Sequence, residues 1–284
     1  MASQFFLSVA AGYLRRFPLE SGKWRVAQFL RRRLAQKPFR GIVPVTGGLS
    51  MELDTSDFLQ REIYIHRDFE PAIRSAIQKR LKPGDAFLDV GANVGFFSLC
   101  ASKAVGPGGS VYAFEPAPKT YKSLCRNLEL NGLANVTALP LALSDSAGQS
   151  KLFMDAKNNS GASSLRQSPH SGDAVDVELD RYDHFSGKKG LPVPALVKID
   201  VEGAEVKVLR GMQALLSRPD RPTVILEVSE LSLRQMESSK EELFELMVGH
   251  GYKASLLSTP RVSIFSDDNI FFQYDVLFVP GGRN

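Results

Sequence analysis

The 284-residue sequence is poor in the residues that build disulfide frameworks, zinc sites and membrane spans. It has two cysteines, Cys100 and Cys125, and four histidines that are scattered along the chain. Cysteines in this setting are typical of small buried side chains, so a disulfide framework and a zinc site are excluded. No apolar run approaches the roughly 20 residues that cross a bilayer. These absences favour a cytoplasmic protein in a reducing compartment.

The excess of basic side chains is confined to one end of the chain. Residues 1–40 carry a net charge of +8, with Glu20 as their only acid, and because the whole chain carries +4, residues 41–284 carry −4. The first arginines follow an apolar stretch instead of preceding it, which argues against a secretory signal. We expect a helical cap that packs apolar side chains on the body or on a second subunit, namely Trp24, Ala27, Leu30 and Leu34. The alternatives are contact with an anionic membrane surface and, in a eukaryote, a mitochondrial transit segment.

Residues 86–106 have the pattern of a buried strand, a glycine loop and a helix. The apolar run reaches Asp89, the loop contains Gly91 and Gly95, and an amphipathic segment follows. Gly91 allows backbone angles closed to other residues, and amides at the helix start point toward a ligand above the loop. A second β-type run ends at Glu115, where a carboxylate is placed to accept hydrogen bonds from a ribose.

The spacing of the glycines separates two classes of ligand. A dinucleotide fold needs G-x-G-x-x-G, but these positions are Gly91, Asn93 and Phe96. Side chains at 93 and 96 would crowd a pyrophosphate, whereas an adenosyl ligand without phosphate does not need that clearance. We therefore expect an adenosyl ligand and not a dinucleotide.

The rest of the chain alternates strands and helices, which predicts an α/β fold with a mostly parallel sheet. Further strands are expected over 136–143, 195–201, 222–230, 252–258 and 271–280, the last of them antiparallel. Helices are expected over 68–82, 96–105, 118–131 and 203–216 and from the end of the 222–230 strand to about Gly249. Residues 1–66 form an appendage with a hairpin at Thr46–Gly48 and a short helix or strand after it. Residues 67–284 form the main domain, with an insertion at 146–190.

The insertion and the strand before it place polar side chains near the ligand. Ser144 and Asp145 follow the 136–143 strand, where Asp145 is placed to accept the adenine amino group or, alternatively, to cap a turn before Gly148. Between two β-type runs, residues 158–172 have a loop composition. Five small polar residues of this loop are candidates for binding the ligand's carboxylate or a polar acceptor: Asn159, Ser160, Gly161, Ser163 and Ser164. A solvated loop, which also contains His170, is the alternative.

Acidic side chains follow the fourth and fifth predicted strands. Strict alternation places Lys198, Asp200 and Glu202 on one side of the chain, and Glu227 ends the next strand. Core packing does not explain this group, and crowded carboxylates raise one another's pKa, as a general base requires. Glu205 is better explained as a cap of the following helix, because its charge is favoured at a helix N-terminus.

Four ordered motifs, LDVGANVGFF, AFEP, LALSD and KIDVEGAEVKVL, together resemble the FkbM family of S-adenosylmethionine-dependent methyltransferases over residues 70–250. The resemblance implies a Rossmann-like class I methyltransferase fold, a seven-stranded sheet with an antiparallel last strand. It also implies O-methylation of a hydroxyl on a sugar, glycan or polyketide-like molecule, and an adenine contact by Asp145. S-adenosyl-L-homocysteine is then the product. The candidate cofactor-binding residues are Asp89, Gly91, Asn93, Gly95, Glu115, Pro116, Ser144, Asp145 and Asp200.

A hydroxyl is a poor nucleophile at neutral pH, so a carboxylate must take its proton. We assign this role to Asp200, with Glu202 or Glu227 as second choices and Lys198 balancing charge. A Mg²⁺ or Ca²⁺ ion held by the three carboxylates is a less favoured alternative, because no Asp-Asn pair completes the set. A non-catalytic adenosyl-binding scaffold is the other alternative. A nucleic-acid partner is not favoured because the body is acidic, and homo-oligomer formation stays open.

Overall fold

The central sheet of the computed structural model has the predicted mostly parallel order. The structure describes residues 12–14, 23–155, 159–167, 171–258, 261–266 and 269–282. The strand order is β11 (Tyr252–Leu256), β13 (Asn269–Pro280), β10 (Thr223–Ser229), β9 (Leu196–Ile199), β3 (Ala86–Val90), β4 (Ser110–Phe114) and β5 (Val136–Leu139). The strands β10, β9, β3, β4 and β5 are parallel, whereas β13 is antiparallel to both of its neighbours. This order confirms the seven strands with an antiparallel last strand.

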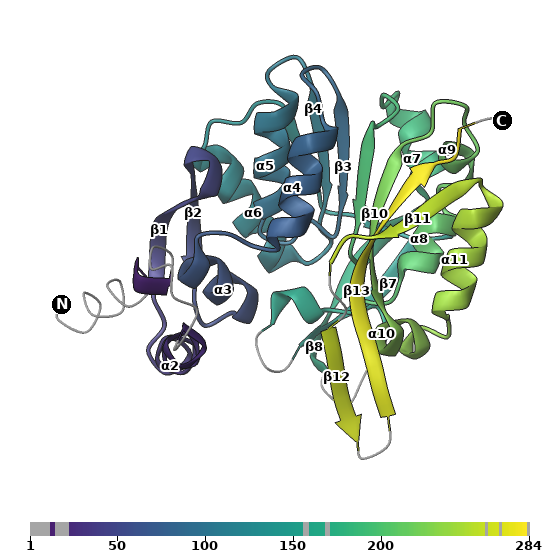
Figure 1. Ribbon diagram of the computed structural model, residues 1–284. Coiled ribbons are helices and arrows are strands. Elements are labelled where there is room, and N and C mark those ends of the chain that lie inside the picture. The colour runs from purple at the N-terminus through teal and green to yellow at the C-terminus, as the bar shows by residue number, and fades with distance from the viewer. Residues whose placement is uncertain are drawn as a thin grey trace.

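One strand was not expected from the sequence. Strand β12 (Arg261–Ser266) pairs with the first half of β13, which extends the long hairpin away from the sheet (Figure 1). The strand predicted over 271–280 therefore begins earlier, at Asn269.

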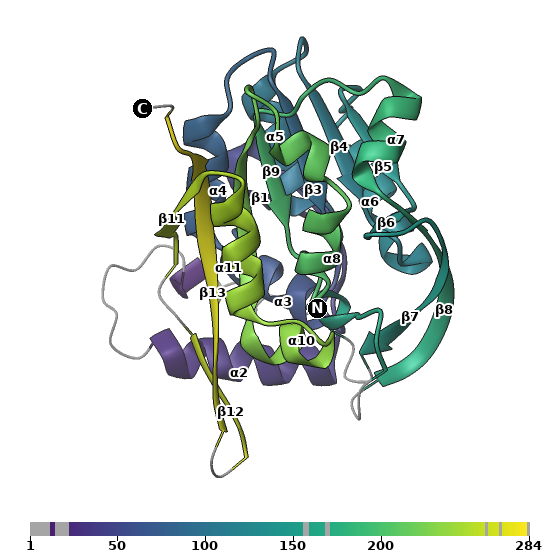
Figure 2. The same ribbon diagram turned by 90° about the vertical axis from the view of Figure 1, so that its right-hand side faces the viewer.

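Helices cover both faces of the sheet (Figures 1 and 2). One hydrophobic cluster contains α4 (Pro71–Arg80), α5 (Phe96–Val105) and α6 (Pro118–Leu130). The other contains α8 (Glu205–Arg210), α9 (Gln213–Leu216), α10 (Glu230–Gln235), α11 (Lys240–Gly249) and the first residue of α7 (Tyr182–Lys189). Neighbouring strand residues point to opposite clusters, as Phe87 and Leu88 do. Burial on both faces explains why the central strands are continuous apolar runs.

The predicted strand over 136–143 is wrong as a single element. It divides at Pro140 into β5 and the short β6 (Ala142–Leu143), because proline cannot donate a ladder hydrogen bond. Strand β6 then joins a separate three-stranded sheet, where it pairs with β8 (Ser171–Asp180), which also pairs with β7 (Gly148–Asp155). The two strands expected in the insertion are thus confirmed, and helix α7 after them was not predicted.

Three predicted helices have different bounds from those expected. Helix α4 starts at Pro71 instead of Asp68, whose carboxylate accepts from Arg74 Nε at 2.7 Å. The helix expected to reach 216 breaks between α8 and α9 at Gly211, where a Cβ would lie 1.9 Å from the backbone oxygen of Ser144. The helix expected to reach Gly249 divides into α10 and α11, and Glu237 between them has a φ of 60°.

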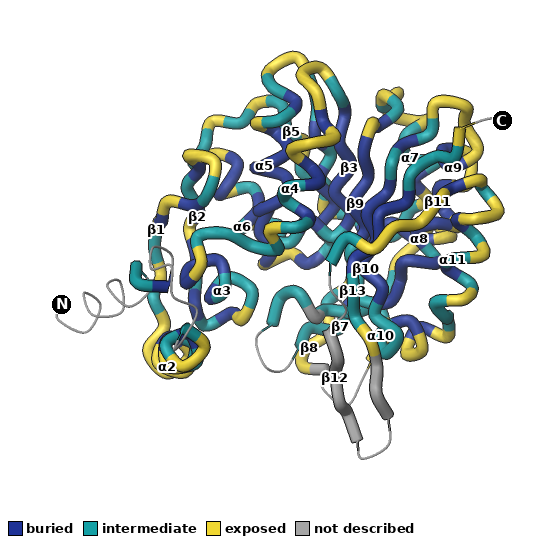
Figure 3. Tube along the Cα trace, in the orientation of Figure 1, coloured by how far each residue is buried: buried dark blue, intermediate teal, exposed yellow. Residues whose placement is uncertain are grey.

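The N-terminal segment packs into the same core as the main domain. It consists of α2 (Lys23–Gln36), the predicted hairpin β1 (Arg40–Val45) and β2 (Leu49–Asp54), and α3 (Phe58–His66), which is a helix and not a strand. Leu30 and Leu34 share a hydrophobic cluster with Ile77 and Leu99. Ala27 is also buried, as expected, but the expected burial of Trp24 is wrong, since 70% of it is exposed. Figure 3 shows the outer side of α2 as largely exposed.

The structure contains no helix that is long and apolar enough to cross a membrane within the ranges it describes.

Candidate active site

A cavity lies at the carboxyl ends of β3, β4 and β9, and we name it the glycine-loop cavity. Its wall is formed by residues 90–94, 114–116, 141–143, 160–161, 198 and 200–202, with aromatic side chains from Phe69, Phe96 and Phe97. The cavity holds about 890 Å³ of empty space, including its open mouth. Parallel α/β sheets bind ligands at this edge, where the strands deliver successive loops to one point.

Gly91 is required by the contact between two loops. Its φ is +82°, and a Cβ at this position would lie 1.9 Å from the backbone oxygen of Asp200. The Asp200 amide in turn donates to the Val90 oxygen at 3.0 Å. Gly95 has a φ of +91° at the start of α5, and its Cβ would lie 2.5 Å from Leu124. The two glycines therefore bring the β3 loop against the β9 loop and against α6, which forms the floor of the glycine-loop cavity.

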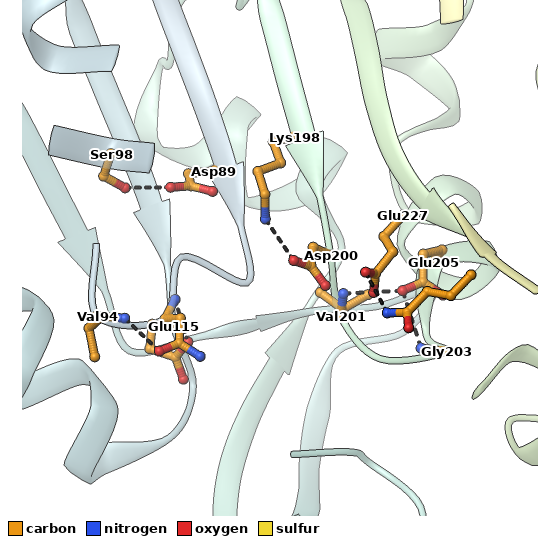
Figure 4. A network of polar contacts seen from close by, with 12 residues as sticks. Asp89, Val94, Ser98, Glu115, Lys198, Asp200, Val201, Gly203, Glu205 and Glu227 are labelled. Carbon is orange, nitrogen blue, oxygen red and sulfur yellow. Dashed lines mark hydrogen bonds and ion pairs between the residues drawn. The ribbon is translucent and has the colours of Figure 1, made fainter. Parts of the chain in front are cut away.

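Glu115 joins the loop after β3 to the end of β4. One carboxylate oxygen accepts from the Asn93 amide and the other from the Ala117 amide, both at 2.9 Å (Figure 4). Burial raises the pKa of Glu115 to about 7, although the two N–H groups lower it. The side chain is buried and lines the glycine-loop cavity, together with Asn93 and Pro116. Hydrogen bonding to a ribose stays a prediction for Glu115.

The other predicted cofactor residues do not all reach the cavity. Asp89 is fully buried, and its carboxylate accepts from the Ser98 hydroxyl at 2.6 Å (Figure 4). Asp145 is exposed and accepts from the Ser144 and Ser146 hydroxyls, while Ser144 itself is buried. The residues of this segment that line the cavity are Leu141, Ala142 and Leu143. The adenine contact of Asp145 stays a prediction.

A second cavity adjoins the first, and we name it the acidic cavity. Asp200 and Glu202 line both cavities, whereas Glu227 lines only the second. Each of the three carboxylates offers an oxygen within 4.8 Å of the others. Lys198 Nζ lies 3.0 Å from Asp200 Oδ2, and Figure 4 shows Asp200 between Lys198 and Glu227. The predicted crowding of Lys198, Asp200 and Glu202 is confirmed, and Glu227 joins them, whereas their catalytic roles stay predictions.

The crowding of carboxylates shifts their protonation. Burial raises the pKa of Glu202 well above its usual range, and the negative charges of Asp200 and Glu205 add to the effect. Burial and the same Asp200 charge, with that of Glu202, raise the pKa of Glu227. Burial alone would lower the pKa of Lys198, but Asp200 and Asp89 raise it, so this ammonium stays charged. The acidic cavity therefore contains two crowded acids of raised pKa, Glu202 and Glu227, next to Asp200, whose carboxylate pairs with the Lys198 ammonium in the wall of the glycine-loop cavity.

Glu205 has the structural role that the sequence predicted. Its Oε1 accepts from the amides of Val201 and Gly203 at 3.1 and 3.2 Å, at the start of α8 (Figure 4). Burial raises its pKa to about 7. Because these amides belong to the loop that carries Glu202, Glu205 fixes that loop instead of contacting the cavities.

The acidic cavity also includes residues that the sequence analysis missed. Gln273 of β13 donates to Glu227 Oε1 at 2.6 Å, and helix α3 contributes Phe58, Glu62 and His66. Glu62 forms an ion pair with Arg31 of α2, whose guanidinium donates to both carboxylate oxygens at 2.7 and 2.6 Å. No spacing or motif in the sequence signals these contacts, since Gln273 lies 46 residues from Glu227.

The polar loop of the insertion lies at the junction of the two cavities. Ser160 donates to Asn93 Oδ1 at 3.1 Å, and its amide donates to Asp57 at 2.6 Å. Ser160, Gly161 and Ser163 line the glycine-loop cavity, whereas Asn159 lines the acidic cavity with Gly161. His170 lies outside the described residues. The placement favours a role for the loop at the site over that of a solvated loop.

The carboxylate oxygens of the acidic cavity could bind a hard divalent cation or take part in proton transfer. Asp200, Glu202 and Glu227 offer carboxylate oxygens, which Mg²⁺ and Ca²⁺ prefer. Crowded acids of raised pKa are equally able to hold protons. The cation thus stays the alternative that the sequence analysis left open.

The strand order, the glycine loop and the carboxylate at the end of β4 define a class I methyltransferase, an enzyme whose cofactor is S-adenosyl-L-methionine. The glycine-loop cavity fits this cofactor, because its wall is largely apolar and presents the Glu115 carboxylate at the end of β4, with Asp200 and Glu202 at the junction with the acidic cavity. The chain belongs to the FkbM methyltransferase family, whose domain matches residues 89–254.

Named relatives have similar sequences. The 31-O-demethyl-FK506 methyltransferase FkbM of Streptomyces tacrolimicus is 29% identical over 224 residues, which is 69% of this chain and 82% of that protein. The hexuronic acid methyltransferase AglP of Haloferax volcanii is 28% identical over 154 residues, 53% of this chain and 60% of that protein. A crystal structure of an O-methyltransferase from Thermotoga maritima has a TM-score of 0.44 at 14% identity, covering 86% of this chain and 79% of that one.

Proposed function

We propose that this methyltransferase transfers a methyl group to a hydroxyl of a sugar, glycan or polyketide-like acceptor bound in the acidic cavity. The observation that carries the proposal is that Asp200 and Glu202 line both cavities. A group at this junction can act on an acceptor oxygen where it meets the cofactor. The printed names of two relatives, an O-demethyl-FK506 methyltransferase and a hexuronic acid methyltransferase, support this class of acceptor.

When bound, S-adenosylmethionine supplies an electrophilic methyl group on a positively charged sulfur. Asp200 takes the hydroxyl proton of the acceptor, because its carboxylate is held in place by Lys198 at 3.0 Å. Proton transfer to a positioned carboxylate contributes roughly 10²–10⁴-fold to a rate. The aromatic walls of the glycine-loop cavity exclude water from the reacting atoms.

Glu202 and Glu227 have a different role in this proposal. Their raised pKa values favour the protonated forms, and a protonated carboxyl group offers an O–H donor to further hydroxyls of the acceptor. Glu62, Asp68 and Glu70 add acids to the same cavity. We therefore expect an acceptor that is rich in hydroxyl groups, which these carboxyl groups can hold by hydrogen bonds.

Two measurements test the proposal. Calorimetry with S-adenosylhomocysteine and NAD, side by side, is expected to show binding of the first and none of the second. A panel of hydroxylated sugars and macrolide alcohols, with matched amines and carboxylic acids, is then incubated with the cofactor and analysed by mass spectrometry. Methyl ethers are the expected products. Methylated amines, or methyl esters alone, would overturn the assignment of a hydroxyl acceptor.

A further inference from the structure

Helix α2 exposes an unusual combination of side chains on its outer face. Its inner face buries Ala27, Leu30 and Leu34, whereas Trp24 and Phe29 are 70% and 53% exposed. Three arginines are exposed between and beside these two rings, at Arg25, Arg32 and Arg33. The helix contains no acidic residue. We name the surface formed by Trp24, Arg25, Phe29, Arg32 and Arg33 the α2 face.

The α2 face is rigidly attached to the enzyme near the acceptor side of the site. Arg31 of the same helix donates twice to Glu62 of α3, and Glu62 lines the acidic cavity. Burial raises the pKa of Glu62, but the hydrogen bonds and positive charges of Arg31 and His66 together outweigh it and lower the pKa to about 2, so the ion pair persists at neutral pH. Figures 1 and 2 show α2 at the end of the molecule where α3 and the β12–β13 hairpin also lie.

We propose that the α2 face docks on the surface of an anionic lipid bilayer. Arginines bind lipid phosphates, and exposed tryptophan and phenylalanine rings settle at the depth of the headgroups. The helix of 14 residues is about 21 Å long, and the five side chains of the α2 face project from about half of its circumference, opposite the buried face. Charge also orients the molecule, because residues 1–40 carry +8 and the remaining residues carry −4.

Two other occupants fit the α2 face less well. A nucleic acid needs a basic surface wider than one helix, but the neighbouring hairpin presents the exposed Ile42 and the acid Glu52. A second copy of the chain would need about 800 Å² of complementary surface on each partner. Two rings interleaved with arginines on one helix do not provide it. An anionic bilayer matches both the charge and the aromatic side chains.

The test uses the fact that Trp24 is the only tryptophan of the chain. The full-length protein is mixed with vesicles of phosphatidylcholine alone or of phosphatidylcholine with phosphatidylserine. We expect a blue shift of tryptophan fluorescence, and co-sedimentation, with the anionic vesicles only, and reversal of both at high salt. No shift and no co-sedimentation would overturn the proposal.

Two triple variants locate the contact. Arg25→Glu/Arg32→Glu/Arg33→Glu is expected to weaken partitioning by at least about tenfold, since each basic residue near the surface contributes about 1 kcal/mol. The control, Lys103→Glu/Lys188→Glu/Lys189→Glu, changes the same net charge at exposed positions on α5 and α7 and is expected to bind almost as well. Unchanged S-adenosylhomocysteine affinity shows that each variant is folded.

Three other outcomes would overturn the proposal. Equal loss of binding in both triple variants would show that net charge, and not the α2 face, is responsible. A blue shift with single-stranded RNA but not with vesicles would assign the face to nucleic acid. A mass that doubles with protein concentration, together with a blue shift in the absence of vesicles, would assign it to a second copy.

Discussion

The two adjoining cavities are built in opposite ways. The glycine-loop cavity is shaped mainly by backbone: the Gly91 contact with Asp200, and the amides of Asn93 and Ala117 on Glu115. The acidic cavity is shaped by side chains from segments far apart in the sequence, such as Glu62, Glu227 and Gln273. The backbone-built cavity suits a cofactor that is the same for every member of such a class. The side-chain cavity can change its acceptor without disturbing the fold.

This difference implies that substitutions should separate the two functions. Changes in the glycine-loop cavity should act on cofactor affinity and stability, whereas changes in the acidic cavity should act on rate. Asp200 lines both cavities and joins their two kinds of contact, because its backbone meets Gly91 while its side chain meets Lys198 and the other acids.

The largest expected effect is on the rate of the Asp200→Asn variant. An amide cannot take the acceptor proton, so kcat should fall roughly 10²–10⁴-fold. The affinity for S-adenosylhomocysteine should change little, because the backbone of residue 200 is kept. Initial rates and calorimetry measure the two quantities, with Glu245→Gln on the exposed side of α11 as the control. An unchanged rate would remove Asp200 from the chemistry.

The next largest effect should follow from Gly91→Ala. A Cβ 1.9 Å from the Asp200 oxygen, at a φ of +82°, forces the β3 and β9 loops apart. We expect a loss of several kcal/mol of unfolding free energy and of most cofactor affinity. Gly108→Ala is the matched control, since nothing lies within 4 Å of its Cβ position. Urea unfolding of both variants checks this, and equal stability would refute the contact.

Glu115→Gln should have a smaller effect, confined to the cofactor. Glutamine keeps one acceptor oxygen for the two amides but loses the charge that strengthens hydrogen bonds to hydroxyl groups. We expect about tenfold weaker S-adenosylhomocysteine binding and little change in kcat at saturating cofactor. Glu129→Gln, an exposed position on α6, serves as the control. A fall in kcat without weaker binding would contradict the division between the cavities.

Stability should fall modestly as pH rises. The pKa of Glu205 is raised from 4.5 to about 7 in the folded chain, so the folded state holds this proton more tightly than the unfolded state. The resulting stability is complete below about pH 4.5 and is lost as pH rises to about 7. Urea unfolding of the cofactor-free protein across this range should show the decline. Glu205→Gln should make it shallower, and an identical slope in the variant would exclude Glu205 as its source.

The smallest expected effect is that of chelation. If protons and not a cation occupy the acidic cavity, EDTA should leave the rate unchanged, because the raised pKa values of Glu202 and Glu227 already relieve the crowding. A loss of activity that Mg²⁺ alone restores would instead place an ion among Asp200, Glu202 and Glu227.

Much of the fold could be predicted because its signals are local. The strand, the glycine loop and the helix at 86–106 are contiguous. Lys198, Asp200 and Glu202 are also close in sequence, although β9 ends at Ile199 and Glu202, with a φ of 53°, does not continue the predicted alternation. The Glu205 cap was also predictable, because its partners lie within four residues. Errors arose where a single residue interrupts a pattern, as Pro140 does between β5 and β6.

The glycine loop and the strand ends of the cofactor cavity could be read from local patterns in the chain, although the contact of Gly91 with Asp200 forms only in the fold. The contacts of the acidic cavity became visible only in the structure: Gln273 donates to Glu227, and α3 forms part of the cavity wall. The exposure of Trp24 was likewise not evident from the sequence. The physical reason is that these contacts join segments brought together by packing of the whole core. No local periodicity or spacing records which distant side chains will meet.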